Sequence, residues 1–407
     1  MREILLLTPQ LPYPPQQGTS LRNLNILRAL AQNNRVTLLS FAESGSLPAL
    51  DYLASLGTVL PPIEVPARSG RDRLRQLLTT GEPDLSLRLR SEPFAAALAD
   101  ALRRFDFDAV QIEGIALAQY MKVVRHVAPR ARIVLDCHNA ETELQRRALR
   151  ADAGKPARWP AALFSALQVG RLERFERWAL GETDAVIAVS PNDRDNMTRL
   201  SAAQQRAIVV VPNTIAVDEY AWSGDVQSPE RFDVVFTGKM DYRPNIDGVL
   251  WFAEAIWPRV LAQRPGATWG IVGQRPYPRL ERLKELLGVT LTGRVPIVQP
   301  YLAGCQVYVV PLRIGSGTRL KLIEAMAAGL AIVSTTIGAE GFPVMPGENI
   351  ALADDPAEFA AAILELLANT QQRQAMGAAA RHFAAGYDWR TIVPLLDGLY
   401  TDLIPEE

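Results

Sequence analysis

The sequence predicts an α/β protein with two Rossmann-like, doubly wound domains whose parallel sheets face a central cleft. Its 407 residues exceed what one ordinary core holds, so two domains of about 150–200 residues are expected. Short apolar runs alternate with longer amphipathic stretches, the pattern of parallel sheets with crossover helices. The two segments that begin at residues 4 and 233 also share one pattern: an apolar strand, a polar loop containing proline and an amphipathic helix. Ligands bind beyond the carboxyl ends of such strands, so chemistry is expected in the cleft.

The first domain is expected to span residues 1–211. Apolar runs predict strands over residues 4–8, 35–41, 109–112, 132–136, 185–190 and 207–211. A helix is predicted over residues 21–32, and two longer helical segments rich in arginine over residues 68–104 and 141–180.

The second domain is expected to span residues 212–385, with the crossing near Val211, Pro212 and Asn213. Its first strand, residues 233–237, leads into a loop over 238–245 and a helix over 246–260. Further strands are predicted over residues 268–272, 290–291, 307–310 and 331–335.

Composition excludes several protein classes. Hydrophobic residues make up 48% and charged residues 21%, a globular balance, and the net charge of −1 does not indicate a nucleic-acid partner. Two cysteines give no disulfide framework, and the scattered histidines and cysteines show no zinc-type spacing, so no metal site is expected. The apolar run at residues 4–7 is too short for a signal-peptide core, and no run approaches the ~18 residues of a membrane span. A cytoplasmic protein is therefore expected.

The most specific stretch runs from Pro311 to Gly329, where a predicted strand is followed by a glycine-rich loop and a helix over residues 318–328. Glycines let backbone N–H groups approach an anion, and the helix start adds its positive dipole end. Arg319 and Lys321 place cations in the first turn, which is unfavourable unless an anion is present. We therefore favour a diphosphate cradle over the alternative of a solvated loop and helix start. Leu320, Ile323 and Ala327 are expected to form the buried face.

Glu324 follows one to two turns into the same helix. Its carboxylate can accept paired hydrogen bonds from the two hydroxyls of a ribose. The alternative is a surface glutamate paired with Lys321 at i+3.

Two other nucleotide-binding motifs are incomplete. Position 320 is leucine where the dinucleotide fingerprint of Gly315 and Gly317 needs a third glycine, and no G-x-x-x-x-G-K-[ST] loop occurs.

Residues at other predicted strand ends also point to the cleft. His138 follows the strand at 132–136 and is a candidate donor to a sugar hydroxyl, and Glu113 follows the strand at 109–112 as a weaker candidate. Lys239, after Gly238, could reach the same diphosphate. Gly18 in the equivalent loop of the first domain permits close backbone approach to a ligand.

Together these residues resemble the retaining glycosyltransferases of the two-Rossmann GT-B architecture, often called family four or glycosyl transferases group 1. The resemblance covers nearly the whole chain. The segments that carry it are residues 11–22, 136–141, 211–214, 236–240, 292–295, 311–329 and 388–400, with Gly273. The first of these segments is similar to a subgroup associated with bacterial exopolysaccharide and cell-surface glycan assembly.

The resemblance implies a role for each matched residue. Glu324 would hold the donor ribose, and the side chains of Lys239, Arg319 and Lys321 would hold the diphosphate. His138 would bind the transferred sugar. The remaining donor contacts would come from Gly18, Gly238, Ser316, Gly317 and Thr318 and, for the base, from the backbone of Arg294 and Val295. The resemblance also implies that a final helix over residues 386–407 completes the first domain.

The sequence departs from the family pattern at two positions. The family commonly has two glutamates eight positions apart, and the first of them is Ser316 here. The usual second basic residue after Lys239 is Pro244, which leaves more of the phosphate charge to Arg319 and Lys321. The donor sugar is therefore not implied.

The implied reaction is a retaining, front-face displacement from a nucleotide-sugar to a glycan or lipid-linked hydroxyl, without metal or cofactor. Cations and a helix start can neutralise the leaving diphosphate. The alternatives are a nucleotide-sugar epimerase, a non-catalytic subunit that binds nucleotide-sugars in a glycan-assembly complex, and, less favoured, an oxidoreductase.

The arginine-rich helical segments have two interpretations. Arg71 and Arg75 alternate with Leu74, Leu77 and Leu78, a mixed basic and apolar face typical of membrane-surface helices. The plain interpretation, solvated arginines on an acceptor-side wall, is favoured. Transient contact with the inner membrane surface, through a lipid-linked acceptor, is retained as a hypothesis.

Overall fold

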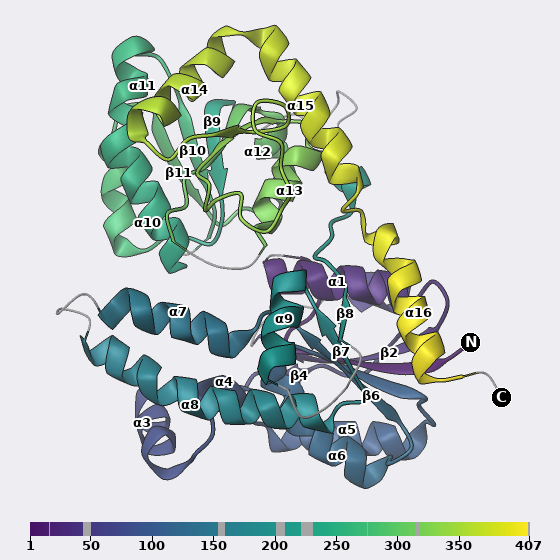
Figure 1. Ribbon diagram of the computed structural model, residues 1–407. Coiled ribbons are helices and arrows are strands. Elements are labelled where there is room, and N and C mark those ends of the chain that lie inside the picture. The colour runs from purple at the N-terminus through teal and green to yellow at the C-terminus, as the bar shows by residue number, and fades with distance from the viewer. Residues whose placement is uncertain are drawn as a thin grey trace. The chain divides into compact units, whose positions relative to one another are not determined.

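The computed structural model describes residues 1–15, 17–43, 50–153, 159–200, 208–220, 231–274, 276–314 and 318–405. The chain forms two compact units (Figure 1). Unit 1 comprises Met1–Pro212 and Trp389–Glu407, and unit 2 comprises Asn213–Asp388. Each unit is built around a parallel sheet with helices, so the predicted α/β class with two doubly wound domains is confirmed.

The sheet of unit 1 has the order β3-β2-β1-β5-β6-β7-β8, with β4 paired to β2, and its pairings are parallel. Its strands are β1 (Glu3–Thr8), β2 (Arg35–Ala42), β3 (Thr58–Val59), β4 (Ile63–Glu64), β5 (Ala109–Glu113), β6 (Arg132–Cys137), β7 (Ala185–Ala188) and β8 (Ile208–Val210). Because β1, β5 and β6 are parallel neighbours, their carboxyl ends share one edge, and Glu113 lies beside Asp136 in the register.

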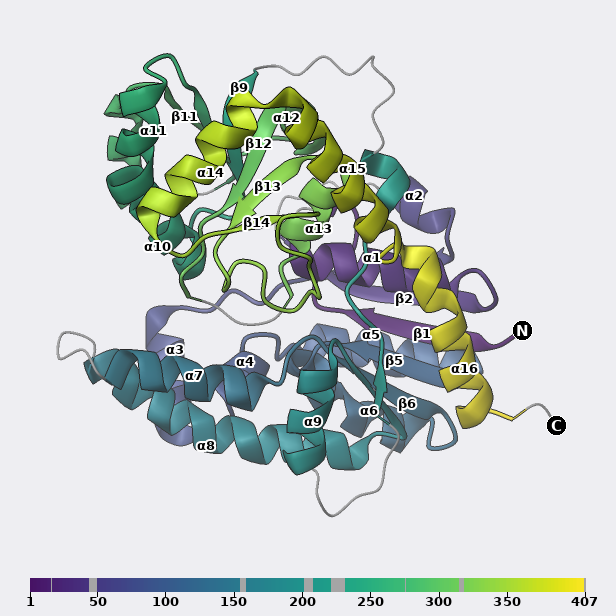
Figure 2. The same cartoon turned by 45° about the horizontal axis from the view of Figure 1, so that its top comes forward.

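Helices cover both faces of this sheet (Figures 1 and 2). They are α1 (Gly18–Leu30), α2 (Leu50–Ala54), α3 (Gly70–Thr79), α4 (Asp84–Leu87), α5 (Glu92–Arg104), η1 (Ile115–Tyr120), α6 (Met121–Val127), α7 (Glu141–Ala153), α8 (Trp159–Glu182), α9 (Pro191–Leu200), η6 (Trp389–Ile392) and α16 (Val393–Leu403).

The strands are almost wholly apolar because both faces are buried. In β1, Leu5 and Leu7 pack into one core with the α5 and η1 side chains, whereas Ile4 and Leu6 pack into the opposite core. The second core also holds side chains of α1 and α16, so the carboxy-terminal helix contributes to unit 1. Tyr400 of α16 is fully buried and donates to Gln111 Oε1 at 2.6 Å.

The sheet of unit 2 has the order β11-β10-β9-β12-β13-β14. Its strands are β9 (Phe232–Thr237), β10 (Trp269–Val272), β11 (Val289–Gly293), β12 (Cys305–Val310), β13 (Ala331–Ser334) and β14 (Ala351–Leu352). Its helices are η3 (Val217–Tyr220), α10 (Arg243–Trp251), η4 (Phe252–Ile256), α11 (Trp257–Gln263), η5 (Pro278–Glu285), α12 (Gln299–Ala303), α13 (Leu320–Ala327), α14 (Pro356–Ala368) and α15 (Thr370–Ala385).

Several predicted helices are wrong in detail. Where one helix is predicted over residues 246–260, the structure has α10, the π-helical turn η4 and α11. Pro258 has no N–H to donate to the i−4 carbonyl, so the helical hydrogen-bond pattern widens to i−5 just before it. The segment at 68–104 is three helices with breaks at Pro83 and before Pro93, and that at 141–180 is two, α7 and α8, which lie side by side (Figures 1 and 2). Helix α13 begins at Leu320, which is only partly buried, and its buried face centres on Leu322, Ile323 and Met326.

Over the described ranges, no helix has both the length and the hydropathy that crossing a bilayer requires.

Candidate functional site

In unit 2, Lys321 lies at the centre of a polar cluster at the carboxyl ends of β9 and β12. It stands in the first turn of α13, and its Nζ donates to Asn245 Oδ1 at 2.8 Å and lies 4.2 Å from the ring centroid of Phe236. Burial, and then the charge of Arg319, lower the pKa of Lys321 to about 7. Because burial and Arg319 both disfavour its charged form, the Lys321 ammonium is suited to meet an anion.

Gly238 makes the room that this ammonium occupies. A Cβ at Gly238 would lie 2.6 Å from Lys321 Nζ and 2.7 Å from Asn245 Nδ2. Asn245 in turn donates to the carbonyl of Lys239 at 2.8 Å, so the loop after β9 and the start of α13 are joined through Asn245. Any side chain at position 238 would displace Lys321.

Glu324 lies one helical turn beyond Lys321. Its Oε1 accepts from the hydroxyl of Tyr220, a buried residue of η3, at 2.6 Å. Burial raises the pKa of Glu324, whereas the Tyr220 hydrogen bond and the Lys321 charge act to lower it. The carboxylate is therefore held in one orientation with a second oxygen available beside the Tyr220 bond.

Arg319 precedes α13 and is 8% exposed. Its Nη2 lies 4.0 Å from Glu340 Oε2, and burial lowers its pKa. Thr318 accepts a hydrogen bond from Asn213. The glycine turn of the predicted cradle, including Ser316 and Gly317, lies outside the described residues.

Three other predicted residues of unit 2 lie in the loops that follow β9 and β11. Lys239 is half-exposed, and its Nζ lies 3.8 Å from Asp241 Oδ1, so an anion would have to compete with that carboxylate. Arg294 is exposed and Val295 partly buried in the loop after β11, the edge strand beside β10.

In unit 1, His138 and Glu113 form a pair at the carboxyl ends of β6 and β5. His138 Nε2 lies 3.1 Å from Glu113 Oε2, and the carboxylate is fully buried. Gly114, at φ +84°, turns the chain beside the His138 ring. A Cβ at Gly114 would lie 3.6 Å from His138 Nδ1. Glu113 also accepts from Gln111 Nε2 at 2.6 Å and, with the Asn23 amide nitrogen turned toward it, from Asn23 of α1 at 3.0 Å. Gly18 opens α1 and is exposed.

A buried ion pair supports this edge. Arg22 of α1 donates to both oxygens of Asp136, at 2.8 and 3.0 Å, and both side chains are nearly or fully inaccessible. The same guanidinium donates to the carbonyls of Val211 and Pro212, at 3.1 and 3.3 Å. Arg22 thereby fixes the backbone at residues 211 and 212, where the chain leaves unit 1, to the strand that precedes His138.

Glu113, Asp136 and His138 have the chemistry of metal ligands, and one ligand atom from each lies within 4.8 Å of the other two. However, Arg22 already occupies both oxygens of Asp136 and supplies the balancing positive charge. A divalent cation would have to displace this bidentate bond and would then face a buried guanidinium. The arrangement fits an organic ligand of His138 better than a metal.

Two family models match the chain. Residues 17–219 match "Glycosyltransferase Family 4", and residues 231–369 match "Glycosyl transferases group 1". The chain belongs to the glycosyltransferases.

Curated relatives of this glycosyltransferase are distant. It is 26% identical over 153 residues to an uncharacterised 44.6 kDa protein in the cps region of Klebsiella pneumoniae, and 23% identical over 261 residues to glycogen synthase of Mycobacterium tuberculosis. These alignments cover 34% and 61% of this chain, and the chain spans 39% and 60% of the length of those relatives.

Solved structures share the fold over the full length. Sucrose-phosphate synthase of Thermosynechococcus elongatus superposes with a TM-score of 0.72 at 17% identity, covering 99% of both chains. HepE of Anabaena, solved in complex with UDP-glucose, superposes with a TM-score of 0.65 at 16% identity, covering 99% of this chain and 100% of that one.

The main residues that sequence reasoning missed are the partners of the predicted ones. Asn245 stood in the predicted loop without a role, and nothing in the sequence marked Tyr220 as the partner of Glu324, 104 residues away. The match of residues 11–22 to the family pattern includes Arg22 and is a usable signal, because an arginine buried in a helix needs partners for its charge.

The Glu113 carboxyl predicts a pH effect on the stability of the glycosyltransferase. Burial, and then the charge of Asp136, raise its pKa to about 7 from 4.5. Between these two pKa values the native state holds a proton that the unfolded chain has released. The stabilisation that this proton gives the native state is therefore full below pH ~4.5 and is lost as the pH rises to about 7. The Glu113→Gln variant mimics the neutral form, so we expect its stability relative to wild type to increase between pH 5 and 8, as measured by urea unfolding.

The control is Glu92→Gln, an exposed carboxyl at the start of α5. A Glu113→Gln stability difference that stays constant from pH 5 to 8 would contradict the raised pKa.

Proposed function

We propose that this glycosyltransferase is a retaining, metal-independent enzyme that moves a sugar from a nucleotide-sugar to a hydroxyl of a glycan or lipid-linked acceptor. The observation that carries the proposal is the cluster of Lys321, Asn245, Glu324 and Tyr220 where α13 begins. It offers a cation for a diphosphate and, one turn away, an oriented carboxylate for a ribose. The UDP-glucose complex of HepE, which has the same fold, supports a nucleotide-sugar donor.

In the proposed reaction, the bond from the anomeric carbon to the diphosphate oxygen breaks while the acceptor oxygen bonds to the same face of that carbon. The departing phosphate oxygen takes the proton of the acceptor hydroxyl. Lys321 and Arg319, with Lys239 in support, stabilise the charge that develops on the diphosphate. Further contacts to the nucleotide-sugar donor are proposed for Gly18, Gly238, Thr318, Ser316, Gly317, Arg294 and Val295.

His138 is proposed to donate to a hydroxyl of the transferred sugar. Its Nε2 faces Glu113, so Nδ1 is left for the ligand, on the side that Gly114 keeps open. The similarity to a protein in a cps region supports an acceptor from cell-surface polysaccharide assembly.

The decisive experiment is a panel of UDP-, GDP- and ADP-sugars. A bound donor raises the melting temperature by mass action, and the stabilising donor is then incubated with candidate acceptors. We expect release of nucleoside diphosphate only with an acceptor, and a product of unchanged anomeric configuration by NMR. A new nucleotide-sugar formed from donor alone would instead identify an epimerase, and binding without release a non-catalytic subunit.

Glu324→Ala is expected to weaken donor binding about 10- to 100-fold, because charge-assisted hydrogen bonds contribute ~1.5–3 kcal/mol. Calorimetric titration with the matching nucleoside diphosphate measures this. Glu358→Ala, an exposed glutamate of α14, is the matched control. An affinity in Glu324→Ala equal to wild type would reject the ribose role.

A further inference from the structure

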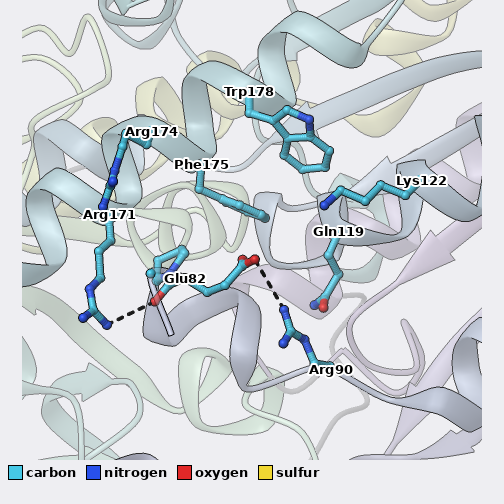
Figure 3. A pocket seen from close by; sticks show the side chains of 10 residues that line it. Glu82, Arg90, Gln119, Lys122, Arg171, Arg174, Phe175 and Trp178 are labelled. Carbon is cyan, nitrogen blue, oxygen red and sulfur yellow. Dashed lines mark hydrogen bonds and ion pairs between the residues drawn. The ribbon is translucent and has the colours of Figure 1, made fainter. Parts of the chain in front are cut away.

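A pocket lies in unit 1, built by residues that the proposed reaction does not use. It has a volume of about 480 Å³ and lies between α8, η1, the start of α6 and the turn between α3 and α4 (Figure 3). Its described lining is Gly81, Glu82, Pro83, Arg90, Gln119, Lys122, Arg171, Arg174, Phe175 and Trp178.

The charge of this pocket is strongly positive. Among the described lining residues, Arg90, Lys122, Arg171 and Arg174 are cationic, and Glu82 is the acidic one. The Glu82 carboxylate lies 3.5 Å from Arg90, so it offsets one charge of the four.

The remaining cations are held by neutral groups. Arg171 donates to the carbonyl of Leu77 at 2.8 Å, and Arg174 to that of Gly170 at 3.3 Å. Lys122 Nζ lies 5.0 Å from the ring centroid of Trp178. Because these partners are uncharged carbonyls and a ring, they orient the cationic side chains but leave their positive charge available to an anion.

An exposed apolar surface adjoins the pocket on α8. Leu163 and Leu167 precede Arg171, Arg174 and Trp178 at spacings of three or four residues, so all five side chains follow one face of the helix. Leu163 is 74% exposed and Leu167 45%. Along this face, aliphatic side chains give way to cations and then to an indole.

Helix α3 adjoins α8 beside the pocket. The bonds from Arg171 to the carbonyls of Leu77 and Glu82 fasten its carboxy-terminal end to α8. No residue of α3 is buried, and Leu74 and Leu78, one turn apart, are 58% and 76% exposed. Its three arginines outnumber its single aspartate.

We propose that unit 1 docks on an anionic phospholipid membrane through this surface, with Leu74, Leu78, Leu163 and Leu167 entering the interface and the pocket receiving a lipid phosphate. Cations beside aliphatic side chains match the charge and the hydrocarbon of such a surface. An acidic glycan would also satisfy the cations and the rings, but it gives exposed leucines nothing to contact. The aliphatic face therefore favours lipid. The inference does not depend on the proposed reaction, since it concerns a different set of residues.

The test is co-sedimentation of the full-length protein with vesicles at low salt, without donor. We expect binding to phosphatidylcholine mixed with phosphatidylglycerol and little binding to phosphatidylcholine alone. Lys122→Gln/Arg174→Gln and Leu163→Ser/Leu167→Ser should each lower the partition coefficient on the order of tenfold or more. Both pairs avoid Arg171, which holds backbone carbonyls.

Matched controls come from unit 2. Arg259→Gln/Arg279→Gln removes two exposed charges, and Leu287→Ser/Ile297→Ser removes two exposed aliphatic side chains, 68% and 57% exposed. The proposal is overturned if wild type does not bind the mixed vesicles, or if the controls lose as much binding as the test variants. It is equally overturned if inorganic phosphate or an acidic oligosaccharide stabilises the protein while vesicles do not bind. Unchanged nucleotide binding in all four variants separates this result from the transferase test.

Discussion

Lys321→Met is expected to lower turnover by about 10²-fold or more, an electrostatic loss of ~3 kcal/mol in the transition state. Methionine keeps an unbranched chain over the Phe236 ring and removes only the charge. Lys321→Ala should lose at least as much. Arg319→Ala is expected to lose a similar factor, because Arg319 directly precedes the same helix and is proposed to face the same diphosphate.

The reason for so large a loss is that Lys321 is held in place before the donor arrives. Asn245 and Phe236 fix the ammonium, and burial has already lowered its pKa to about 7. A diphosphate beside it favours the charged form, so nucleoside diphosphate binding at pH 8 should take up protons. Calorimetry in buffers of different ionisation enthalpy measures this uptake, and Lys321→Met should abolish it.

Lys284→Met is the matched control, since Lys284 is an exposed lysine of η5 paired with Glu281. Full turnover in Lys321→Met, or proton uptake that survives the substitution, would refute the proposed role.

Most of the fold could be predicted because its signals are local. The apolar runs at residues 4–8 and 233–237 need only their neighbours in sequence to be recognised as buried parallel strands. The prediction was wrong where a local rule was outweighed. Residues 246–260 have helical periodicity throughout, but Pro258 forces a π-helical turn in the middle. The two-residue strands β3, β4 and β14 carry too little pattern to be detected.

The candidate site was predictable to the extent that strand topology brings residues together. The sequence places Glu113 and His138 at strand ends, and the parallel register pairs Glu113 with Asp136, two residues before His138. Their direct contact, at 3.1 Å, could not be predicted, because it depends on how the two side chains are oriented in the folded protein. Likewise Lys321 was recognised, but its dependence on Asn245, 76 residues earlier, is a property of tertiary packing.

Arg22→Met is expected to destabilise unit 1 by about 3–5 kcal/mol, because it leaves the Asp136 carboxylate buried without its cation. Urea unfolding followed by tryptophan fluorescence measures the loss. The control is Arg35→Gln, which removes an exposed pair with Glu3 in the same unit and should cost less than ~1 kcal/mol. A loss in Arg22→Met no larger than that control would contradict the prediction.

The double variant Arg22→Met/Asp136→Leu should recover much of this stability, since a packed apolar pair of similar volume replaces the ion pair. It should not recover turnover, because the charges beside Glu113 are still missing. Asp136 raises the pKa of Glu113 and Arg22 lowers it, so the ion pair sets the charge of the group that His138 faces. If turnover followed stability back to wild type in the double variant, the pair would be structural. If stability returned and turnover did not, Arg22 and Asp136 would act on the reaction through Glu113 and His138.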